Sequence, residues 1–260
     1  MEQIQIKKAI KAGNSSAVIL PRSWLNKEVR VELARKTNEM ILNETLSIIR
    51  NNHIELKEII GIYLTGSYAR GEEDTNSDID VLVITRNTDK ELIKDSVYNI
   101  FVVSLDVLKR KLKEDLLPLG QMIKEAKALL NSDFLESFDV TVNKKNVLWH
   151  IQTTQEKFKM IEEILEFIKS KKQVPDRVIY TLVLRIRSIY IINCLIKNKS
   201  YSKNNFVQLI NKVSHGNASY QRYLAVKNDL KQDYIVSLEE AQRLYFYLKR
   251  ELEIVKKRLG

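Results

Sequence analysis

The spacing of hydrophobic residues changes along this chain and divides it into parts. Up to about residue 142 the apolar residues come in short runs of strand length, and residues 60–65 and 79–85 are the clearest of these. Beyond that point they recur at helical spacing. One such stripe comprises Leu238, Ala241, Leu244 or Tyr245, Leu248, Leu252 and Val255. The pattern predicts an α+β protein with a small N-terminal β unit, a central mixed sheet and a C-terminal helical bundle.

We place these three domains at residues 1–35, 36–142 and 143–260. The first is predicted to hold a strand from Ile4, a turn at Gly13-Asn14 and a second strand over 17–20. Pro21 breaks the pattern, and the alternating Val29, Val31 and Leu33 predict a third strand. About thirty residues can hardly build a core alone.

Further elements are predicted around the two clear strands of the central domain. Helices are expected over 37–59, with Asn38 as the cap, and over 90–96, 106–113 and 121–130, with a strand over 97–104. In the bundle, Pro175 is expected to separate the first two helices, and residues 197–203 to form another loop.

The most informative chemistry lies between the two clear strands. Gly66 has no side chain, so the backbone there can approach a polyphosphate, and Ser67 can offer a hydroxyl and an amide. Asp78 and Asp80 project on one face, because successive strand side chains alternate. Two convergent carboxylates suit Mg²⁺, which binds through one or two carboxylates and substrate phosphates. The alternative is an ordinary turn and solvated acids at a strand end.

Gly66-Ser67, Arg70-Gly71 and the run from Ser77 to Asp80 resemble the signature of the DNA polymerase beta-type nucleotidyltransferases, especially the minimal and kanamycin-type branch. The resemblance implies a mixed sheet flanked by helices, with ATP or another nucleoside triphosphate bound at Gly66, Ser67 and Arg70. It also implies Mg²⁺ held by the catalytic pair Asp78 and Asp80, and a hydroxyl acceptor.

The family pattern has a third carboxylate on a later strand, which helps hold the metal and activates the hydroxyl. Here Asn99 stands at the aligned position, with Asp95 just before the strand and Asp106 just after it. A shifted register could bring one of these acids in. A positioned general base contributes roughly a hundred- to ten-thousand-fold in rate, so its absence would slow transfer without abolishing it.

The N-terminal run from Lys11 to Leu25, followed by Val29, Arg30 and Val31, resembles the AbrB-type swapped-hairpin DNA-binding module. That family dimerises by interleaving hairpins, so the resemblance implies a homodimer. Candidate contacts to DNA phosphates are Lys7, Lys8, Lys11 and Arg22. A purely structural role in dimerisation is the alternative.

The helical bundle resembles the helical partner of kanamycin-type nucleotidyltransferases and, more loosely, the HEPN domain. In HEPN domains an arginine is followed by a histidine for RNA cleavage, whereas Arg187 is followed by Asn193 at that distance, so ribonuclease chemistry is not expected. Arg185 and Arg187 point to different faces of one helix. Such an arginine could reach a bound phosphate or form an internal ion pair.

Charge is unevenly distributed along the chain. The net charge of +10 is the sum of +4 in residues 1–35, −6 in 36–142 and +12 in 143–260. An acidic metal site beside a basic bundle could clamp nucleotide phosphates or an anionic acceptor, although the lysines could equally solvate helix surfaces.

Composition narrows the class of protein further. The longest apolar run, near residues 189–196, is interrupted by Asn193 and preceded by arginines, so no membrane span is expected. No signal peptide is visible, and Cys194 has no second cysteine to pair with. We expect a cytoplasmic protein. His53, His150 and His215 have no metal-ligand spacing.

Two functions follow as hypotheses. The first is a magnesium-dependent nucleotidyltransferase that moves a nucleoside monophosphate onto a hydroxyl of a protein, RNA or small molecule. The second is a dimeric DNA-binding regulator, or an antitoxin-type protein, whose nucleotidyltransferase domain binds nucleotide with weak or no turnover. The intact Gly-Ser turn and aspartate pair favour the first, and the missing third acid favours the second.

Overall fold

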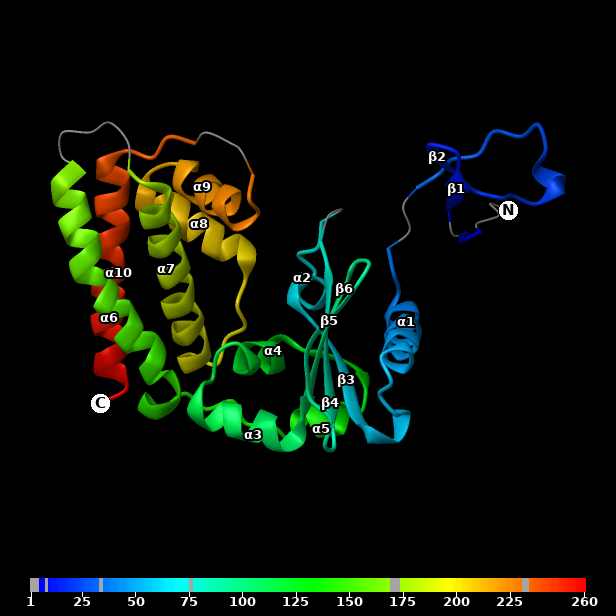
Figure 1. The fold of residues 1–260 in the computed structure, drawn as a ribbon, viewed down its shortest axis with the longest axis horizontal. Coiled ribbons are helices and arrows are strands. Elements are labelled where there is room, and N and C mark those ends of the chain that lie inside the picture. The colour runs from blue at the N-terminus through cyan, green and yellow to red at the C-terminus, as the bar shows by residue number, and fades with distance from the viewer. Residues whose placement is uncertain (1–4, 8, 33–34, 75–76, 169–173, 231–233) are drawn as a thin grey trace. The chain divides into compact units, whose positions relative to one another are not determined.

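The computed structural model describes residues 5–7, 9–32, 35–74, 77–168, 174–230 and 234–260. The chain divides into two compact units, Met1–Ile41 and Leu42–Gly260, whose elements are labelled in Figure 1. The larger unit contains both the sheet and the helical bundle. The prediction of three domains therefore stays a prediction.

A five-stranded mixed sheet forms the first half of the larger unit. Its strands are β3 (Ile59–Thr65), β4 (Ile79–Thr85), β5 (Lys90–Asp95), β6 (Tyr98–Ser104) and β7 (Lys127–Leu130). They lie in the order β5-β6-β4-β3-β7, with β4 and β6 parallel and the other neighbours antiparallel. The parallel pair places the starts of β4 and β6 at the same edge, where the predicted carboxylates lie.

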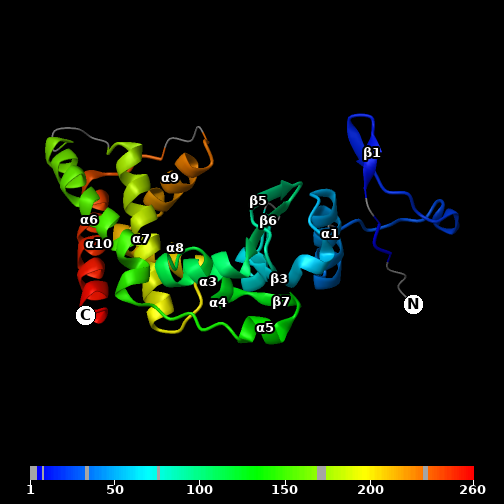
Figure 2. The ribbon, with the colours of Figure 1, turned by 60° about the horizontal axis from the view of Figure 1, so that its bottom comes forward.

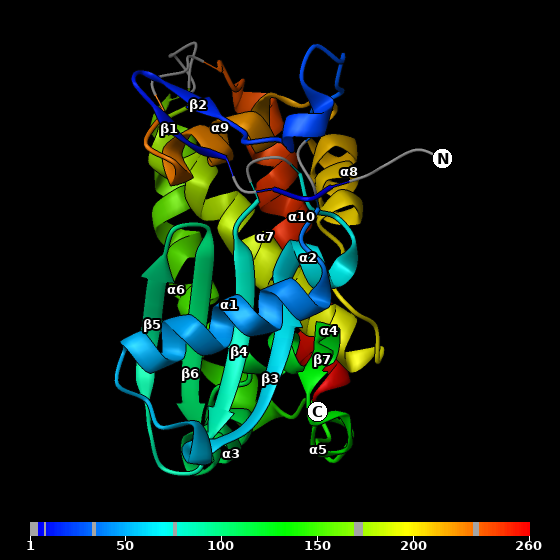
Figure 3. The same ribbon diagram turned by 90° about the vertical axis from the view of Figure 1, so that its right-hand side faces the viewer.

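Each face of the sheet buries every second side chain. On one face Leu82, Ile84 and Val103 pack with α3 (Leu105–Glu114) and α4 (Leu119–Glu125), while α5 (Ser132–Glu136) contacts β3 and β7. Helix α1 (Asn38–Asn51) crosses the other face, as Figure 3 shows. Because strand side chains alternate, the residue that starts β4 on the α3 side is Asp80.

The second half of the larger unit is a bundle of long helices beside the sheet (Figure 2). Its members are α6 (Lys144–Phe167), α7 (Asp176–Ile196), α8 (Lys203–Ser214), α9 (Ala218–Lys227) and α10 (Leu238–Arg258). The stripe expected on α10 is buried from Ala241 to Val255. Pro175 precedes α7, and residues 197–202 connect α7 to α8, both as predicted.

Two predicted helices are wrong. Residues 90–95 form β5, which pairs with β6 after a turn in which Ser96 has a φ of 53°. The predicted helix 121–130 ends at Glu125, and β7 follows because it pairs with β3 at the sheet edge. Strand pairing overrides local helix propensity in both cases, in a hairpin with the next strand for β5 and with a strand distant in sequence for β7.

Helix α1 is shorter than the predicted 37–59. It ends at Asn51, since His53 adopts a φ of 59°, and a short 3-10 turn, Leu56–Glu58, follows. The cap is also shifted by one residue, because the Thr37 hydroxyl accepts a hydrogen bond from the Met40 N–H at 3.2 Å.

The N-terminal unit contains one short hairpin. Strands β1 (Ile10–Ala12) and β2 (Ser15–Ala17) pair antiparallel around Gly13, whose φ of 61° suits the turn. The predicted second strand ends at Ala17, before a 3-10 turn at Arg22–Trp24. The predicted third strand is absent over the described residues 29–32, which have no partner strand there. Ile4 and Leu33 lie outside the described residues.

Helix α7 alone among the described residues is long and apolar enough to cross a membrane, with a mean hydropathy of 1.6. The sequence expectation of no membrane span considered only residues 189–196 of this longer helix. Half of the apolar stretch of α7 is buried, and the core of the bundle includes Leu182, Val183, Ile186 and Ile192. A core helix of a bundle meets the same criteria of length and composition.

A buried carboxylate joins the sheet to the bundle. Glu72 lies just after the Gly66 turn and accepts hydrogen bonds from the Ser202 hydroxyl at 2.6 Å and the Lys203 N–H at 2.9 Å, at the N-terminus of α8. It also pairs with Arg70 at 2.8 Å. These contacts lower the pKa of Glu72 to about 2 despite its burial.

We predict that Glu72→Gln lowers the free energy of unfolding by about 2–4 kcal/mol, because Arg70 loses a buried anionic partner. A depressed pKa gives stability that is present above about pH 4.5 and lost as the pH falls towards 2. The deficit of the variant should therefore shrink across that window. Denaturant titrations at several pH values measure this, with the exposed Glu239→Gln as control; an equal deficit at pH 3 and pH 7 would contradict it.

Candidate active site

The two predicted carboxylates lie at the edge where β4 and β6 begin. Asp80 pairs in register with Asn99 of the parallel strand β6. The Asn99 amide nitrogen donates to Asp78 Oδ2 at 3.2 Å and to Asp80 Oδ1 at 3.3 Å. The structure therefore brings Asp78, Asp80 and Asn99 together on the face that carries α3 and α4.

Gly66 is the residue that lets Asp80 occupy this position. It has a φ of 68°, and a Cβ there would lie 2.2 Å from Asp80 Oδ2. Any side chain at residue 66 would therefore displace the carboxylate. The close approach of the turn to Asp80 explains the glycine more directly than the predicted approach to a phosphate.

Asp80 is held in an unfavourable environment for an anion. Burial raises its pKa above the ordinary value; the hydrogen bond from Asn99 lowers it, and the charges of Asp78 and Glu125 raise it further. Such a carboxylate gains stability when a cation arrives. Perturbed acids of this kind are typical of functional sites.

The resemblance implies a third carboxylate, and neither of the two candidate acids reaches this edge of the sheet. Asp95 of β5 pairs with Tyr98 of β6, and paired residues project on the same face of a sheet. Because Tyr98 and Asn99 are consecutive, Asp95 projects on the face opposite Asn99. Asp106 lies in the first turn of α3, beyond the far end of β6, and the strand from Asn99 to Ser104 alone spans about 16 Å. The strand register is therefore not shifted towards Asp95 or Asp106, and Asn99 lies at the position of the third carboxylate.

Arg70 and Glu125 fix the Gly66 turn from the other side. Arg70 Nη1 lies 2.7 Å from Glu125 Oε2, and Glu125 Oε1 accepts the Gly66 N–H at 2.9 Å. Burial alone would lower the pKa of Arg70, but Glu72 and Glu125 outweigh it and raise the pKa. The contacts of Arg70 are those of a turn-stabilising residue, and its predicted contact to nucleotide stays a prediction.

Glu125 is the site residue that sequence reasoning missed. Its side chain is 4% exposed, and it comes from the end of α4, far along the chain from the turn that it binds. Nothing in the sequence around it signals this role, because no motif or hydrophobic period connects it with the turn. Only the pairing of β7 with β3 brings it to the turn.

Ser67 leaves a polar group available at the turn. It follows Gly66 in the short helix α2 (Gly66–Arg70), and its hydroxyl has no hydrogen-bond partner among the described residues. The Gly66 N–H, in contrast, is already donated to Glu125. The contact of Ser67 with a nucleotide stays a prediction.

The donor set fits a magnesium ion that shares its ligands with a substrate. Within the described part of the chain no group of three or more His, Cys, Asp or Glu residues could hold a metal alone. Asp78 and Asp80 offer two carboxylates, and Mg²⁺ commonly completes its shell with substrate phosphates and water. The site therefore suits an ion that arrives with a nucleotide.

The two arginines of α7 serve different surroundings. Arg185 donates to the Thr153 hydroxyl of α6 at 2.9 Å and lies 5.9 Å from the Trp149 ring centroid. Arg187 lies 5.3 Å from the centroid of the Tyr201 ring, and Arg70 lies at the same distance from that ring. The prediction that the two arginines use different faces is confirmed, and Tyr201 connects Arg187 with the Gly66 turn.

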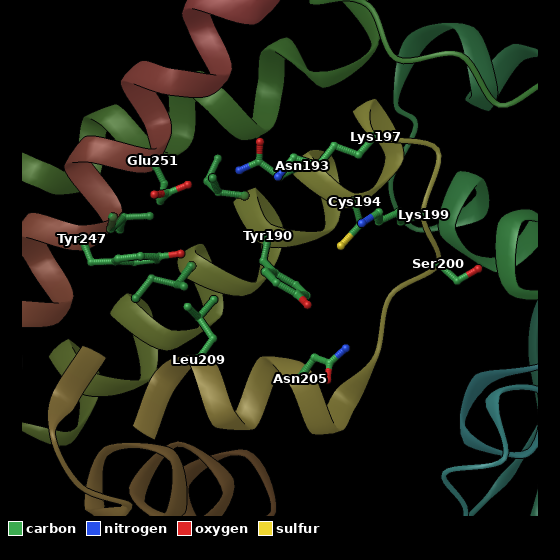
Figure 4. Close-up of a pocket in the computed structure, with 13 residues that line it drawn as sticks. Tyr190, Asn193, Cys194, Lys197, Lys199, Ser200, Asn205, Leu209, Tyr247 and Glu251 are labelled. Atoms are coloured by element: carbon green, nitrogen blue, oxygen red, sulfur yellow. The ribbon is translucent and has the colours of Figure 1, made fainter. Parts of the chain in front are cut away.

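A separate cavity of about 330 Å³ lies inside the bundle (Figure 4). Tyr190, Asn193 and Cys194 of α7 line it together with Lys197 and Lys199 of the connection to α8. Cys194 is partly buried, and burial raises the pKa of its thiol. None of the predicted site residues lines this cavity.

The candidate DNA contacts belong to the N-terminal unit. Lys7, Lys11 and Arg22 lie on the described residues, Lys11 on the hairpin and Arg22 on the 3-10 turn, whereas Lys8 lies outside them. Their role stays a prediction.

The nucleotidyltransferase domain family matches residues 46–188. This match covers more than half of the chain, from within α1 to within α7, and includes the Gly66 turn and both aspartates. The chain belongs to this nucleotidyltransferase family. No curated protein matches the chain significantly.

Several solved structures are similar to the chain at low identity. A nucleotidyltransferase-like protein from Exiguobacterium sibiricum 255-15 is 14% identical, with 85% of this chain and 77% of that one covered and a TM-score of 0.38. The spectinomycin adenyltransferase AAD(9) from Enterococcus faecialis, solved with ATP and spectinomycin, is 14% identical over 82% and 98%, with a TM-score of 0.41. A toxin-antitoxin solved with AMP-PNP is 22% identical over 47% and 96%, with a TM-score of 0.26.

We predict that Gly66→Ala displaces the Asp80 carboxylate and weakens Mg²⁺ binding by at least tenfold, because the new Cβ takes its place. Gly71→Ala is the matched control, since Gly71 has a nearly identical φ of 69° but open space around it. Both variants should lose about 1 kcal/mol of stability from the left-handed conformation. Calorimetric titration with Mg²⁺ and AMP-PNP separates them; equal affinities would contradict the displacement.

Proposed function

We propose that this protein is a magnesium-dependent nucleotidyltransferase that moves a nucleoside monophosphate from ATP or another nucleoside triphosphate to a hydroxyl acceptor. The observation that carries the proposal is the aspartate pair held on one face against the side-chain-free Gly66 turn. Membership of the nucleotidyltransferase family supports it. The raised pKa of Asp80 also supports it, since a purely architectural fold gains nothing from a buried carboxylate beside a second one.

In this proposal each residue of the site has a defined part. Asp78 and Asp80 would hold Mg²⁺, which when bound would neutralise charge developing on the phosphates. The Ser67 hydroxyl would donate to a phosphate oxygen, while Arg70 and Glu125 keep the turn in place. Asn99 would orient the two carboxylates through its amide nitrogen. An amide cannot accept the proton of the acceptor hydroxyl, so the rate should be modest.

Incubation with Mg²⁺ and ATP labelled at the α-phosphate, with cell lysate as the source of acceptor, tests the proposal. The wild type should label a discrete product, and Asp78→Ala with Asp80→Ala should reduce that label by at least a hundredfold, because the metal ligands are lost. Chelation by EDTA should have the same effect. If ATP binds but no product is labelled under any condition, the proposed transfer is wrong.

The variant Asn99→Asp serves as the gain-of-function arm of this assay. It places a third carboxylate beside Asp78 and Asp80 at the position where the family has one. A supplied general base should raise the rate of labelling, by up to roughly a hundredfold. No gain, with Mg²⁺ affinity at least as high as in the wild type, would show that position 99 is not where a general base acts.

A second proposal concerns the N-terminal unit, which would form a homodimer and bind DNA. Its large apolar side chains are unusually exposed, at 62% for Ile6, 70% for Ile19 and 72% for Leu25 and Val31. A second copy could bury them, since one short hairpin cannot. Lys7, Lys11 and Arg22 would then contact phosphates, as would Lys8 outside the described residues. In this proposal the natural Asn99, which stands where the family has a third acid, suits a regulator that binds nucleotide with little turnover.

Gel-shift titrations of duplex DNA at rising salt test the second proposal. The logarithm of affinity should fall by about 0.9 per contacted phosphate for each unit in log salt concentration. Changing Lys7, Lys11 and Arg22 together to Gln should weaken binding and flatten that slope, whereas the exposed Lys27→Gln should lose at most one contact. Absence of any shift at low salt would exclude DNA binding, and sedimentation of the same samples measures the dimer.

A further inference from the structure

The cavity inside the bundle has an apolar interior and a polar mouth (Figure 4). Ile186, Ile189 and Leu248 line it and are buried residues of the bundle core. Lys197 and Lys199 line it from the connection between α7 and α8, where both are exposed. Its volume of about 330 Å³ is at the lower end of the range found for small-molecule sites. The cavity therefore suits a small ligand with an apolar body and a polar end.

The two lysines give the mouth of the cavity a positive charge. Among the described residues, no carboxylate lies within 4.0 Å of the ammonium group of Lys197 or of Lys199. An anion in the cavity would be attracted by both charges, because both lysines line the same space.

Glu251 lines the cavity as well, but it does not cancel this positive charge. It lies on α10, across the cavity from Lys197 and Lys199 in Figure 4. Its Oε1 atom accepts hydrogen bonds from Arg250 at 3.1 and 3.3 Å, so its negative charge already has a partner. The charge that remains for a ligand is therefore the positive one.

Two side-chain amides add hydrogen-bond donors to those of the lysines. Asn193 Oδ1 accepts a hydrogen bond from Arg258 Nη1 at 2.8 Å, which orients the amide and leaves Asn193 Nδ2 as a donor. Asn205 lines the cavity from the first turn of α8, and its side chain has no hydrogen-bond partner within the part of the chain that the structure describes. Ammonium and amide donors together suit the oxygens of a carboxylate, which only accept.

The cavity is separate from the carboxylate edge of the sheet. Tyr190 lines it, and the centroid of the Tyr190 ring lies 5.9 Å from that of Tyr201 and 5.5 Å from that of Phe206. Tyr201 in turn contacts Arg70, and neither Tyr201 nor Arg70 lines the cavity. The two tyrosines therefore stand between the cavity and the Gly66 turn, and a nucleotide bound at that turn would not enter the cavity.

The single cysteine of the protein reports on the same space. Cys194 lines the cavity and is partly buried. Burial raises the pKa of its thiol, whereas the Tyr190 hydroxyl and the charges of Lys197 and Lys199 lower it. A reagent that reaches the Cys194 thiol through the cavity is therefore exposed to the charges of both lysines.

We propose that this cavity binds a small organic anion with an apolar body, such as an aromatic or aliphatic carboxylate. The anionic group would lie at Lys197 and Lys199, and the body would lie against the apolar interior. A cationic ligand would be repelled by the two lysines, and a neutral one would leave both charges without a partner. The site is independent of the proposed nucleotidyl transfer, because no residue assigned to that reaction lines the cavity.

Alkylation of Cys194 by two reagents of nearly equal size tests the charge preference. Iodoacetate is an anion and iodoacetamide is neutral. With either reagent the thiolate sulfur attacks the CH₂ carbon, an S–C bond forms, iodide leaves and the thiol proton goes to solvent. Both reactions use the same thiolate, so the ratio of the iodoacetate rate to the iodoacetamide rate does not depend on the thiol pKa. This ratio should be roughly fivefold higher in the folded wild type than in the urea-unfolded chain.

Changing Lys197 and Lys199 together to Gln should lower this ratio of rates to the value of the unfolded chain. Lys212→Gln is the matched control, since it removes an exposed lysine of α8 that does not line the cavity, and it should leave the ratio unchanged. An equal ratio in the wild type and in the double variant would overturn the proposal.

Protection of Cys194 tests the ligand class on the wild-type protein. Phenylacetate and hexanoate should slow alkylation by iodoacetamide in a saturable way. The neutral phenylacetamide should require an about tenfold higher concentration, as expected for the loss of one charge-assisted contact. Saturating Mg²⁺ and AMP-PNP should leave the rate unchanged.

Three results of the protection experiment would overturn the proposal. They are no protection by either carboxylate, equal protection by phenylacetate and phenylacetamide, and protection by AMP-PNP, which would assign the cavity to the nucleotide site. Because alkylation is measured directly, a failure of labelled transfer would leave the result standing.

Discussion

The structure depends on one interaction, the buried pairing of Arg70 with Glu72 and Glu125. One guanidinium bridges two carboxylates from different elements, and each carboxylate also binds a backbone N–H. Glu125 accepts the Gly66 N–H, and Glu72 accepts the N–H that begins α8. Removing any of the three side chains would leave buried charge uncompensated, which is strongly destabilising. The same contacts therefore fix the Gly66 turn and attach the bundle to the sheet.

The aspartate pair beside this turn is held at the expense of stability. Gly66 must remain without a side chain, and Asp80 must remain half-buried beside Asp78, with Asn99 and the charge of Arg70 to offset the repulsion. A site with a raised carboxylate pKa is less stable as an empty site than as one that holds a cation. Functional sites commonly reduce stability in this way, and the buried ion pairs of Arg70 hold the turn in place against that loss.

Local patterns predicted the parts of the fold that local physics decides. The two strands around the turn, the shared face of Asp78 and Asp80 and the stripe on α10 follow from periods of two and 3.6 residues. The wrong helix at residues 90–96 is a strand that forms a hairpin with β6 after the turn at Ser96, and the missed β7 pairs with β3, which is distant in sequence. Glu125 could not be found, because it lies 59 residues from the N–H that it binds, and the Ser202 partner of Glu72 lies 130 residues away. Distances of that kind are set by the tertiary fold and leave no periodic trace.

The charge around the Gly66 turn is mostly negative. Asp78, Asp80, Glu72 and Glu125 surround the Gly66 turn, and Arg70, the cation among them, is already paired twice. The Gly66 N–H is donated to Glu125. The turn therefore offers a nucleotide the Ser67 hydroxyl as a donor but little positive charge. A polyphosphate would be repelled from the sheet alone. Favourable binding there would require positive charge from elsewhere, such as the metal ion that the proposed function assigns to Asp78 and Asp80.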